Sequence, residues 1–467
     1  MPKGPKVVGF LAISAALTGW IVALGTPAVS ASARGAVVTV PGVDHRALGD
    51  DPRAHERHRA GQHGRHRQRE HGRQRENQHL LRDVTLAVTP AQKDETDSQA
   101  LPYNSQKTDA SANPQSDQHS RSDVASGGGA PEAIDRYLRD LAARNQFTGS
   151  VLVARRGKVL ARFASGLADE ANDIPNRPGT IFRVASVTKQ FTSMLVLKLR
   201  DRGLLGLDDP ICPYLIPTYI TTCPADWQPI TIRELLIHTS GIPDYQNLPG
   251  FYTMLSQPTT TREIISRFVN LPLTSPPGTT WKYTSSGYIV AGAIIQSVTH
   301  KPYGTVLREE ITRPLHLKHT GYSRGNPPDG YAKGYFTVGS PAPPINGSEA
   351  FSATGLYTTT DDLVRWDRAF GADLVAPPAT VEEAFTPQAQ CPANGCLNLP
   401  SSAYAFGWLV DTLEGHRLRY HPGLLTGYSA SNMYLPDDDI EVVVLSNVEK
   451  TDTNGIARRL ATIALDS

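Results

Sequence analysis

The chain has 467 residues, 39% of them hydrophobic, and its 46 basic and 45 acidic side chains leave a formal net charge of +1. This length leaves room for more than one folding unit, because single hydrophobic cores stop growing near roughly 250 to 300 residues. The balanced charge gives no overall argument for a nucleic-acid partner, and we expect none.

Residues 1–33 have the layout of a secretory signal peptide. Two lysines precede an uncharged apolar run, and Ala-Ser-Ala at residues 31–33 provides a small-x-small cleavage site. The alternative is an uncleaved membrane anchor, because the run over residues 7–24 is just long enough to span a bilayer. Both interpretations predict export, to the periplasm, the cell envelope or the medium, with membrane attachment only if the segment is retained.

Residues 34–130 are expected to be a disordered, low-complexity linker. The stretch "HERHRAGQHGRHRQREHGRQRENQH" combines Arg, His and Gln with almost no apolar residue, so it cannot bury enough surface to offset chain entropy. Its "HERHR" does not match the His-Glu-x-x-His spacing of a zinc site, and we predict no metal and no cofactor. The glycines at 127–129 are interpreted as a flexible joint.

The folded domain is predicted over residues 131–467. Its first segment is an amphipathic helix, with apolar residues at i, i+3, i+4 and i+7: Ile134, Tyr137, Leu138 and Leu141. Two hairpins follow near opposite ends, "GSVLVARRGKVLARFASG" and "GYSASNMYLPDDDIEVVVLSN", and "GIARRLATIAL" predicts a terminal helix. We therefore expect an α/β (α+β) fold, in which an antiparallel sheet flanked by helices meets a mostly helical subdomain and the active site lies in the cleft between them.

The four cysteines occur as two close pairs. Local pairing, Cys212 with Cys223 and Cys391 with Cys396, is the simplest of the three possible connectivities and suits an exported protein. A zinc site is the alternative, although it calls for tighter cysteine spacing and nearby histidines.

The stretch "FRVASVTKQFT" places Ser186 three residues before Lys189 at the predicted start of a helix. Residues i and i+3 share a helix face, and the free N–H groups of a helix N-terminus favour a developing oxyanion. A lysine kept partly dry beside a serine can lose its proton and act as a base. The alternative is that Ser186 only caps the helix and Lys189 is solvated.

Two later stretches carry further candidate residues. In "KYTSSGY" Tyr283 precedes a helix marked by Ser285, and a tyrosine hydroxyl near a cation can relay a proton; the alternative is an aromatic packing wedge. In "RYHPGLLTGYSAS" His421 and Gly423 are predicted on a strand that Pro422 confines to a sheet edge open to a cleft. Glycine there would let another backbone, such as an extended substrate, approach closely.

Together these residues resemble the serine β-lactamase and penicillin-binding family, in its branch of class C β-lactamases, D-stereospecific peptidases and esterases. The resemblance covers residues 131–467 and rests on "FRVASVTKQFT", "LLIHTSGIPDY", "KYTSSGY", "HPG" and "ATGLYTTTDDLVRW" in the family's order. One position departs from the pattern, because Ser285 stands where the family often has Asn. His238, in the second stretch, is interpreted as a residue that holds a turn.

The resemblance implies a role for each matched residue. Ser186 would be the acylated nucleophile, with Lys189 and Tyr283 sharing the base and acid roles. His421 would assist proton relay or bind a substrate carboxylate, and Gly423 would give clearance. The oxyanion hole would consist of the backbone N–H groups of Ser186 and Leu424.

The sequence thus predicts an exported, monomeric serine hydrolase that acts through a covalent acyl-enzyme on an amide, a β-lactam or an ester. Its partner would be a small-molecule or peptide substrate, a class that includes peptidoglycan-derived peptides. The alternative is a penicillin-binding-type receptor that is acylated once without turnover, or a binding module that uses the cleft only to bind.

Overall fold

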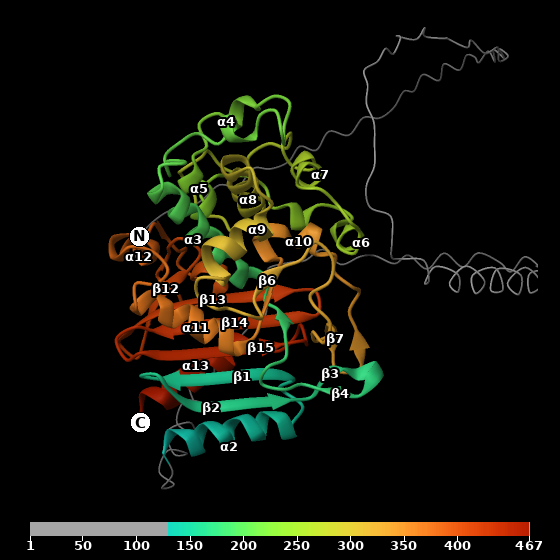
Figure 1. Cartoon of the computed structure of the whole chain (residues 1–467), viewed down its shortest axis with the longest axis vertical. Coiled ribbons are helices and arrows are strands. Elements are labelled where there is room, and N and C mark those ends of the chain that lie inside the picture. The colour runs from blue at the N-terminus through green and yellow to red at the C-terminus, as the bar shows by residue number, and fades with distance from the viewer. Residues whose placement is uncertain (1–128, 467) are drawn as a thin grey trace, which may run out of the picture. The chain divides into compact units, whose positions relative to one another are not determined.

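The computed structural model describes residues 129–466, and the chain within this range forms a layered α/β structure (Figure 1). The predicted signal peptide at 1–33 and the predicted linker up to residue 128 lie outside the described residues. The first described helix, α2 (Ala130–Ala143), begins one residue before the predicted start of the folded domain.

The central element is an antiparallel sheet whose strands differ in length and follow the order β10-β11-β12-β13-β14-β15-β1-β2. Its strands are β1 (Gly149–Arg155), β2 (Lys158–Ser165), β10 (Ala389–Gln390), β11 (Ala403–Tyr404), β12 (Leu409–Leu413), β13 (His416–Leu425), β14 (Tyr428–Leu435) and β15 (Ile440–Ser446). Both predicted hairpins are present, as β1-β2 and β14-β15. They join through β1 and β15, where Gly149 lies opposite Ser446, so strands from both ends of the domain form one sheet.

One face of this sheet is covered by the first and last helices, α2 and α13 (Thr453–Leu465), which also contact each other. The apolar spacing explains why α2 packs there, because Ile134, Leu138 and Leu141 are buried in a core shared with α13 and the strands. This confirms the predicted covering layer.

The other face of the sheet carries the remaining helices, which form the mostly helical part drawn at the top of Figure 1. They are α3 (Thr188–Asp201), α4 (Cys212–Leu215), α5 (Ile232–Leu236), α6 (Phe251–Met254), α7 (Thr261–Ser266), α8 (Ser285–Thr299), α9 (Tyr303–Leu307), α10 (Gly347–Thr354), α11 (Thr360–Gly371) and α12 (Pro378–Phe385). A second, larger apolar core lies between them and the sheet.

Short elements connect these layers. The small sheets are β3-β4 (Leu167–Asp169, Ile174–Pro175), β5-β9-β6 (Phe182–Arg183, Leu356–Thr358, Gly321–Tyr322) and β7-β8 (Tyr335–Thr337, Ser340–Pro341). The short helical turns are η2 (Glu170–Asn172), η3 (Ala185–Val187), η4 (Ala225–Trp227), η5 (Tyr245–Asn247), η6 (Arg308–Thr312) and η7 (Cys396–Asn398).

Helix α3 is buried around nearly its whole circumference. Polar residues such as Gln190 and Ser193 are as buried as Phe191, whose ring stacks on Trp366 at 4.2 Å between centroids. The cause is its position, because α3 lies between the sheet side of the molecule and helices α8 and α10. The polar side chains find partners there; Ser193, for example, bonds to the Tyr288 hydroxyl at 2.9 Å.

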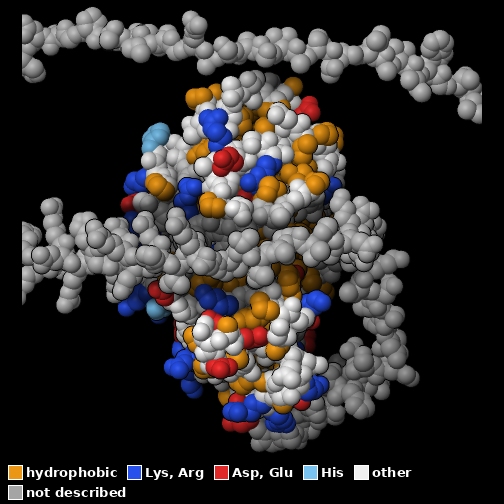
Figure 2. Space-filling view, turned by 90° about the vertical axis from the view of Figure 1, so that its right-hand side faces the viewer, with side chains coloured by type: hydrophobic (Ala, Val, Ile, Leu, Met, Phe, Trp, Pro, Cys, Tyr) orange, Lys and Arg blue, Asp and Glu red, His pale blue; other side chains and the backbone are white. Residues whose placement is uncertain are grey.

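Both predicted disulfides are confirmed, Cys212–Cys223 and Cys391–Cys396. Between residues 129 and 466, no helix combines the length and apolar character needed to cross a bilayer. In the same range no cluster of His, Cys, Asp and Glu is arranged to hold a metal ion. On the face drawn in Figure 2, basic and acidic side chains are interspersed outside the grey atoms.

Candidate active site

Ser186 lies in the 3-10 turn η3, which leads directly into α3. Its side chain is 8% exposed, and the preceding Ala185 adopts a φ of +47°, a left-handed conformation that costs free energy for a residue with a Cβ. The strained turn therefore presents Ser186 at the N-terminal end of a long buried helix, close to the position that the sequence predicts.

Lys189 is completely buried beside Ser186. Its Nζ lies 3.1 Å from Ser186 Oγ, 3.4 Å from Ser285 Oγ and 3.1 Å from the Ala353 carbonyl. Burial lowers the pKa of this amine to about 7, and a coulombic interaction with Asp244 acts in the opposite direction. The structure thus excludes a solvated Lys189 and places an amine that is readily deprotonated in hydrogen-bond contact with the serine.

Asp244 is a residue of the site to which the sequence analysis assigned no role. Its side chain accepts hydrogen bonds from the N–H groups of Gln246 and Ser285, and burial raises its pKa while the charge of Lys189 lowers it. Each group thus favours the charged form of the other, whereas burial favours the neutral form of both.

Tyr283 packs over the lysine, with Lys189 Nζ 4.8 Å from the centre of its ring. His238 holds the tyrosine segment in place: its carbonyl accepts from the Lys282 N–H at 2.8 Å and its Nδ1 from the Thr284 N–H at 3.2 Å. The His238 and Tyr283 rings lie 4.3 Å apart between centroids. Burial lowers the pKa of His238, so its ring is neutral; it holds a turn, as predicted, and that turn carries Tyr283.

Ser285 begins helix α8 and bridges two side chains of the site. Its Oγ contacts Lys189 Nζ and donates to the Gln246 side-chain carbonyl at 3.2 Å. The position where the family often has Asn therefore carries a hydroxyl here, and the nearby amide belongs to Gln246. No local pattern predicts this contact, because Gln246 and Ser285 are 39 residues apart in the chain.

The strand that carries His421 is not an edge strand of the sheet, and this prediction was wrong. Strand β13 has neighbours on both sides, but its pairing with β12 ends at Tyr420, whereas β14 accompanies it to Leu425. The segment 421–425 therefore has one open side although the strand is interior. Pro422 fits there because only one ladder is required.

His421 is completely buried, and both ring nitrogens are engaged within the protein. Nδ1 donates to the Pro422 carbonyl at 2.6 Å, which leaves Nε2 as an acceptor for the Tyr404 hydroxyl at 3.1 Å. Burial, followed by the charge of Lys189, lowers the His421 pKa to about 3. A neutral ring with two internal partners is suited to holding the strand and less suited to binding a carboxylate.

Gly423 brings the open segment of β13 against the turn that precedes Ser186. A Cβ on Gly423 would lie 2.3 Å from the Val184 carbonyl oxygen, so no other residue fits without movement. The next residue, Leu424, has a side chain that is 49% exposed. The open segment of β13 thus lies against the turn η3 that carries Ser186.

The predicted residues thus come together from three parts of the chain. Ser186 and Lys189 come from η3 and α3, Tyr283 and Ser285 from the start of α8, and the segment 421–425 from β13. Unpredicted members are Asp244, Gln246 and Tyr404. The first two lie in or next to the quoted "LLIHTSGIPDY", whereas nothing in the sequence marks Tyr404.

Comparisons with known proteins agree with this geometry. The beta-lactamase family model matches residues 134–466, more than half of the chain. Penicillin-binding protein 4* of Bacillus subtilis is 28% identical over 336 residues, which are 68% of this chain and 72% of that protein. Protein flp of Staphylococcus aureus is 27% identical over 325 residues, and the chain spans only 63% of its length.

Solved structures show the same fold. The octameric penicillin-binding protein homologue from Pyrococcus abyssi superposes with a TM-score of 0.64 at 23% identity, over 72% of this chain and 77% of that one. D-amino acid amidase from Ochrobactrum anthropi SV3 gives a TM-score of 0.63 at 24% identity, over 72% and 99%.

A sheet covered by helices on both faces, with a buried Ser-x-x-Lys pair at the start of a helix, places the molecule in the β-lactamase and penicillin-binding class of proteins. The chain belongs to the beta-lactamase family.

Proposed function

We propose that the protein is a serine hydrolase that forms a covalent acyl-enzyme on Ser186 and acts on an amide, a β-lactam or an ester. The observation that supports this most is the 3.1 Å contact between Ser186 Oγ and a fully buried Lys189 amine whose pKa is lowered to about 7. At neutral pH about half of such amines are unprotonated and able to accept the serine proton.

The acylation step follows from these contacts. Neutral Lys189 accepts the proton of the Ser186 hydroxyl while Oγ attacks the substrate carbonyl carbon. The resulting oxyanion is held by the N–H groups of Ser186 and Leu424. Tyr283, beside Lys189, passes the proton to the leaving nitrogen or oxygen as its bond to the carbonyl carbon breaks. A water molecule then cleaves the acyl-enzyme by the same proton transfers in reverse.

Other residues position these groups. His238 fixes the Tyr283 segment, and Asp244 raises the Lys189 pKa against the larger effect of burial. We assign His421 to holding the open strand through Tyr404 and Pro422. All named groups come from one chain, so a monomer suffices. The mechanism uses only groups of this chain and water, with no cofactor.

We further propose that the protein acts outside the cytoplasm, on a small-molecule or peptide substrate of the cell envelope, a class that includes peptidoglycan-derived peptides. The two disulfides support an oxidising compartment. The names of the relatives, penicillin-binding proteins and a D-amino acid amidase, support an acyl compound of D-configuration.

Mass spectrometry after reaction with a fluorophosphonate and with a β-lactam tests the proposal. We expect one covalent adduct on Ser186 and none on Ser186→Ala, with hydrolysis reduced by up to about a millionfold, the loss found when other serine enzymes lose the nucleophile. Ser285→Ala is the matched control, because it removes a neighbouring hydroxyl and should still form the adduct. An adduct on another serine would contradict the assignment. A β-lactam adduct that never turns over, with no hydrolysis of esters or D-peptides, would favour the receptor alternative.

A further inference from the structure

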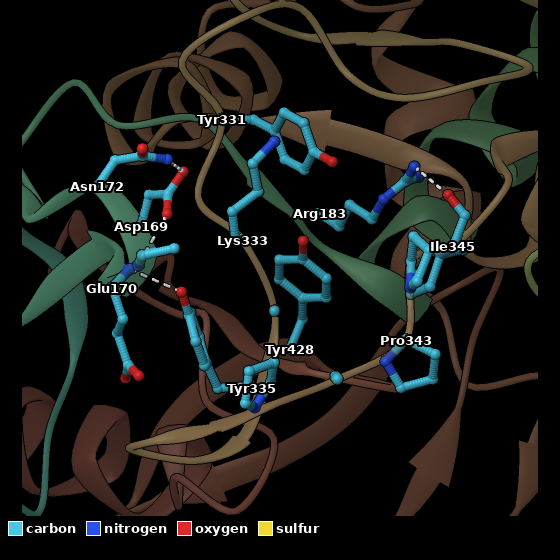
Figure 3. Close-up of a pocket in the computed structure, with 15 residues that line it drawn as sticks. Asp169, Glu170, Asn172, Arg183, Tyr331, Lys333, Tyr335, Pro343, Ile345 and Tyr428 are labelled. Atoms are coloured by element: carbon cyan, nitrogen blue, oxygen red, sulfur yellow. Dashed lines mark hydrogen bonds between the residues drawn. The ribbon is translucent and has the colours of Figure 1, made fainter. Parts of the chain in front are cut away.

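A pocket of about 550 Å³ lies at the end of the open strand segment and is not used by the mechanism above. It is formed by three loops, residues 169–172, 331–335 and 341–345, together with Arg183 and Tyr428 (Figure 3). Tyrosine rings and prolines make its walls, and charged side chains lie on opposite sides of it. The kind of ligand that the pocket could bind depends on which of these charged side chains have no ion-pair partner within the protein.

Arg183 is 2% exposed and carries a permanent positive charge. Its Nη2 donates to two backbone carbonyls, of Ile345 at 2.8 Å and of Gly325 at 3.1 Å. Within residues 129–466 it forms no ion pair; burial lowers its pKa, and the groups that oppose this effect are tyrosines. A buried guanidinium with only dipolar partners leaves the pocket in need of a negative charge.

Lys333 supplies a second cation on the pocket rim. Its side chain is exposed, and its Nζ lies 4.0 Å from the centre of the Tyr331 ring. Figure 3 shows Lys333 and Arg183 on either side of the space above Tyr428, with the lysine directed toward Tyr331 and the arginine toward Ile345. Between residues 129 and 466 no carboxylate pairs with Lys333, so both cations remain open to a new anionic partner.

The acidic residues of the pocket are already engaged. Asp169 accepts hydrogen bonds from the Ala171 N–H at 3.1 Å and from the Asn172 amide at 2.8 Å. Glu170 accepts from the Gly339 N–H with both carboxylate oxygens, at 3.1 and 3.0 Å. These carboxylates keep their charge, but Figure 3 shows Asp169 beside Asn172 and the Glu170 carboxylate pointing away from Lys333 and Arg183. A ligand near the two basic residues therefore meets mainly positive charge.

The position of the pocket relative to Ser186 defines which part of a substrate reaches it. Arg183 precedes Ser186 by three residues, so their Cα atoms are at most about 10 Å apart, the reach of three extended residues. At the start of the open strand segment the ring of His421 lies 6.2 Å from that of Tyr283, the proposed proton donor to the leaving group. The acyl part of a substrate must extend the other way, toward Leu425 and then Tyr428.

We propose that this pocket is an acyl-side subsite for a carboxylate carried about three residues before the scissile bond of an extended peptide. Arg183 and Lys333 neutralise the carboxylate, and the tyrosine and proline walls contact the chain that bears it. The inference rests on the proposed function and adds to it the charge and length of the substrate.

The test uses two matched peptides, succinyl-D-Ala-D-Ala-p-nitroanilide and its acetyl counterpart, which differ in one carboxylate. Isothermal titration with the Ser186→Ala protein measures binding without turnover, and kcat/KM of the unmutated protein measures its use. We expect the succinyl peptide to bind about tenfold more tightly or better, the usual gain from hydrogen bonds to a charged group.

Lys333→Glu, made in the Ser186→Ala protein, should abolish or reverse the preference. Lys158→Glu is the matched control, because it makes the same charge change at an exposed site on β2 and should preserve the preference. Arg183→Met should also abolish the preference for the succinyl peptide. Because Arg183 is buried, this variant is informative only if its melting temperature is unchanged. The main test therefore uses the exposed Lys333.

Equal binding of the two peptides, no binding of the succinyl peptide, or a preference that survives Lys333→Glu would overturn the subsite. Failure of the proposed function is recognised separately, by the absence of a Ser186 adduct. An adduct on Ser186 together with equal binding of the two peptides would refute the subsite alone.

Discussion

Replacing Gly423 with alanine tests whether the close approach of β13 to the Ser186 turn is needed for catalysis. The added Cβ would lie 2.3 Å from the Val184 carbonyl oxygen, where ordinary contact begins at 3.4 Å. One of the two backbones must therefore move by about 1 Å, and each carries one proposed oxyanion donor. A misplacement of about 1 Å can cost about a hundredfold in rate, so we expect kcat/KM to fall by at least that factor.

The stability cost should be smaller than the catalytic one. Forcing an extra methyl group into a packed contact costs about 1–3 kcal/mol in the free energy of unfolding. Rates with a nitrophenyl ester and with nitrocefin, measured below the melting transition of the variant, separate the two effects. Titration with a fluorophosphonate counts the sites that still acylate.

Gly179→Ala is the matched control, because a Cβ on Gly179 would meet no atom within 4 Å. We expect its rate and melting temperature to stay close to those of the unmutated protein. If Gly423→Ala keeps its activity within threefold while folding normally, the backbone contact is not part of the oxyanion site, and the assignment of Leu424 fails with it.

Three further predictions concern the base. Because Lys189 must be neutral to accept a proton, kcat/KM should rise with pH through about 7. Asp244→Asn should move this rise to lower pH, since the carboxylate raises the lysine pKa. A pH-independent rate between 5 and 9 would argue against this base. The lowered pKa also means that the unfolded chain binds the extra proton between about 7 and its usual 10.5, so this group makes the free energy of unfolding increase with pH over that window. Lys189→Ala and Tyr283→Phe should each reduce kcat/KM by about a hundredfold to ten-thousandfold, and the double variant should lose little more than the worse single one. Independent, multiplicative losses would show that the two residues do not act as one unit. An unchanged rate in Tyr283→Phe would return the tyrosine to a packing role.

Much of the fold follows from local patterns in the sequence. The apolar spacing of 130–143 predicts α2, and the two hairpins predict the strands that join at β1 and β15. Capping chemistry is equally local: Thr231 and Glu234, three residues apart, form a capping box at the start of α5. These elements are predictable because their determinants lie within a few residues.

The edge prediction for the His421 strand failed because proline reports on a single backbone position. Pro422 excludes a ladder bond at its own nitrogen, which a strand can satisfy at a sheet edge or where a neighbour stops short. Here the pairing with β12 stops two residues earlier, at Tyr420. The position where a partner strand ends depends on residues far away in the sequence. The residues around 422 therefore cannot predict it.

The properties of Lys189 depend on distant chain in the same way. The contacts that surround its amine besides Ser186 come from residues 96 and 164 positions away, Ser285 and Ala353. The same Ser-x-x-Lys spacing on a solvated surface helix would leave the lysine with its usual pKa and no ability to act as a base near pH 7. The Ser-x-x-Lys motif can provide a base near pH 7 only because α3 is enclosed between the sheet side of the molecule and helices α8 and α10. A substitution that loosened this enclosure, without touching Ser186 or Lys189, would therefore raise the lysine pKa toward 10.5 and reduce activity at neutral pH.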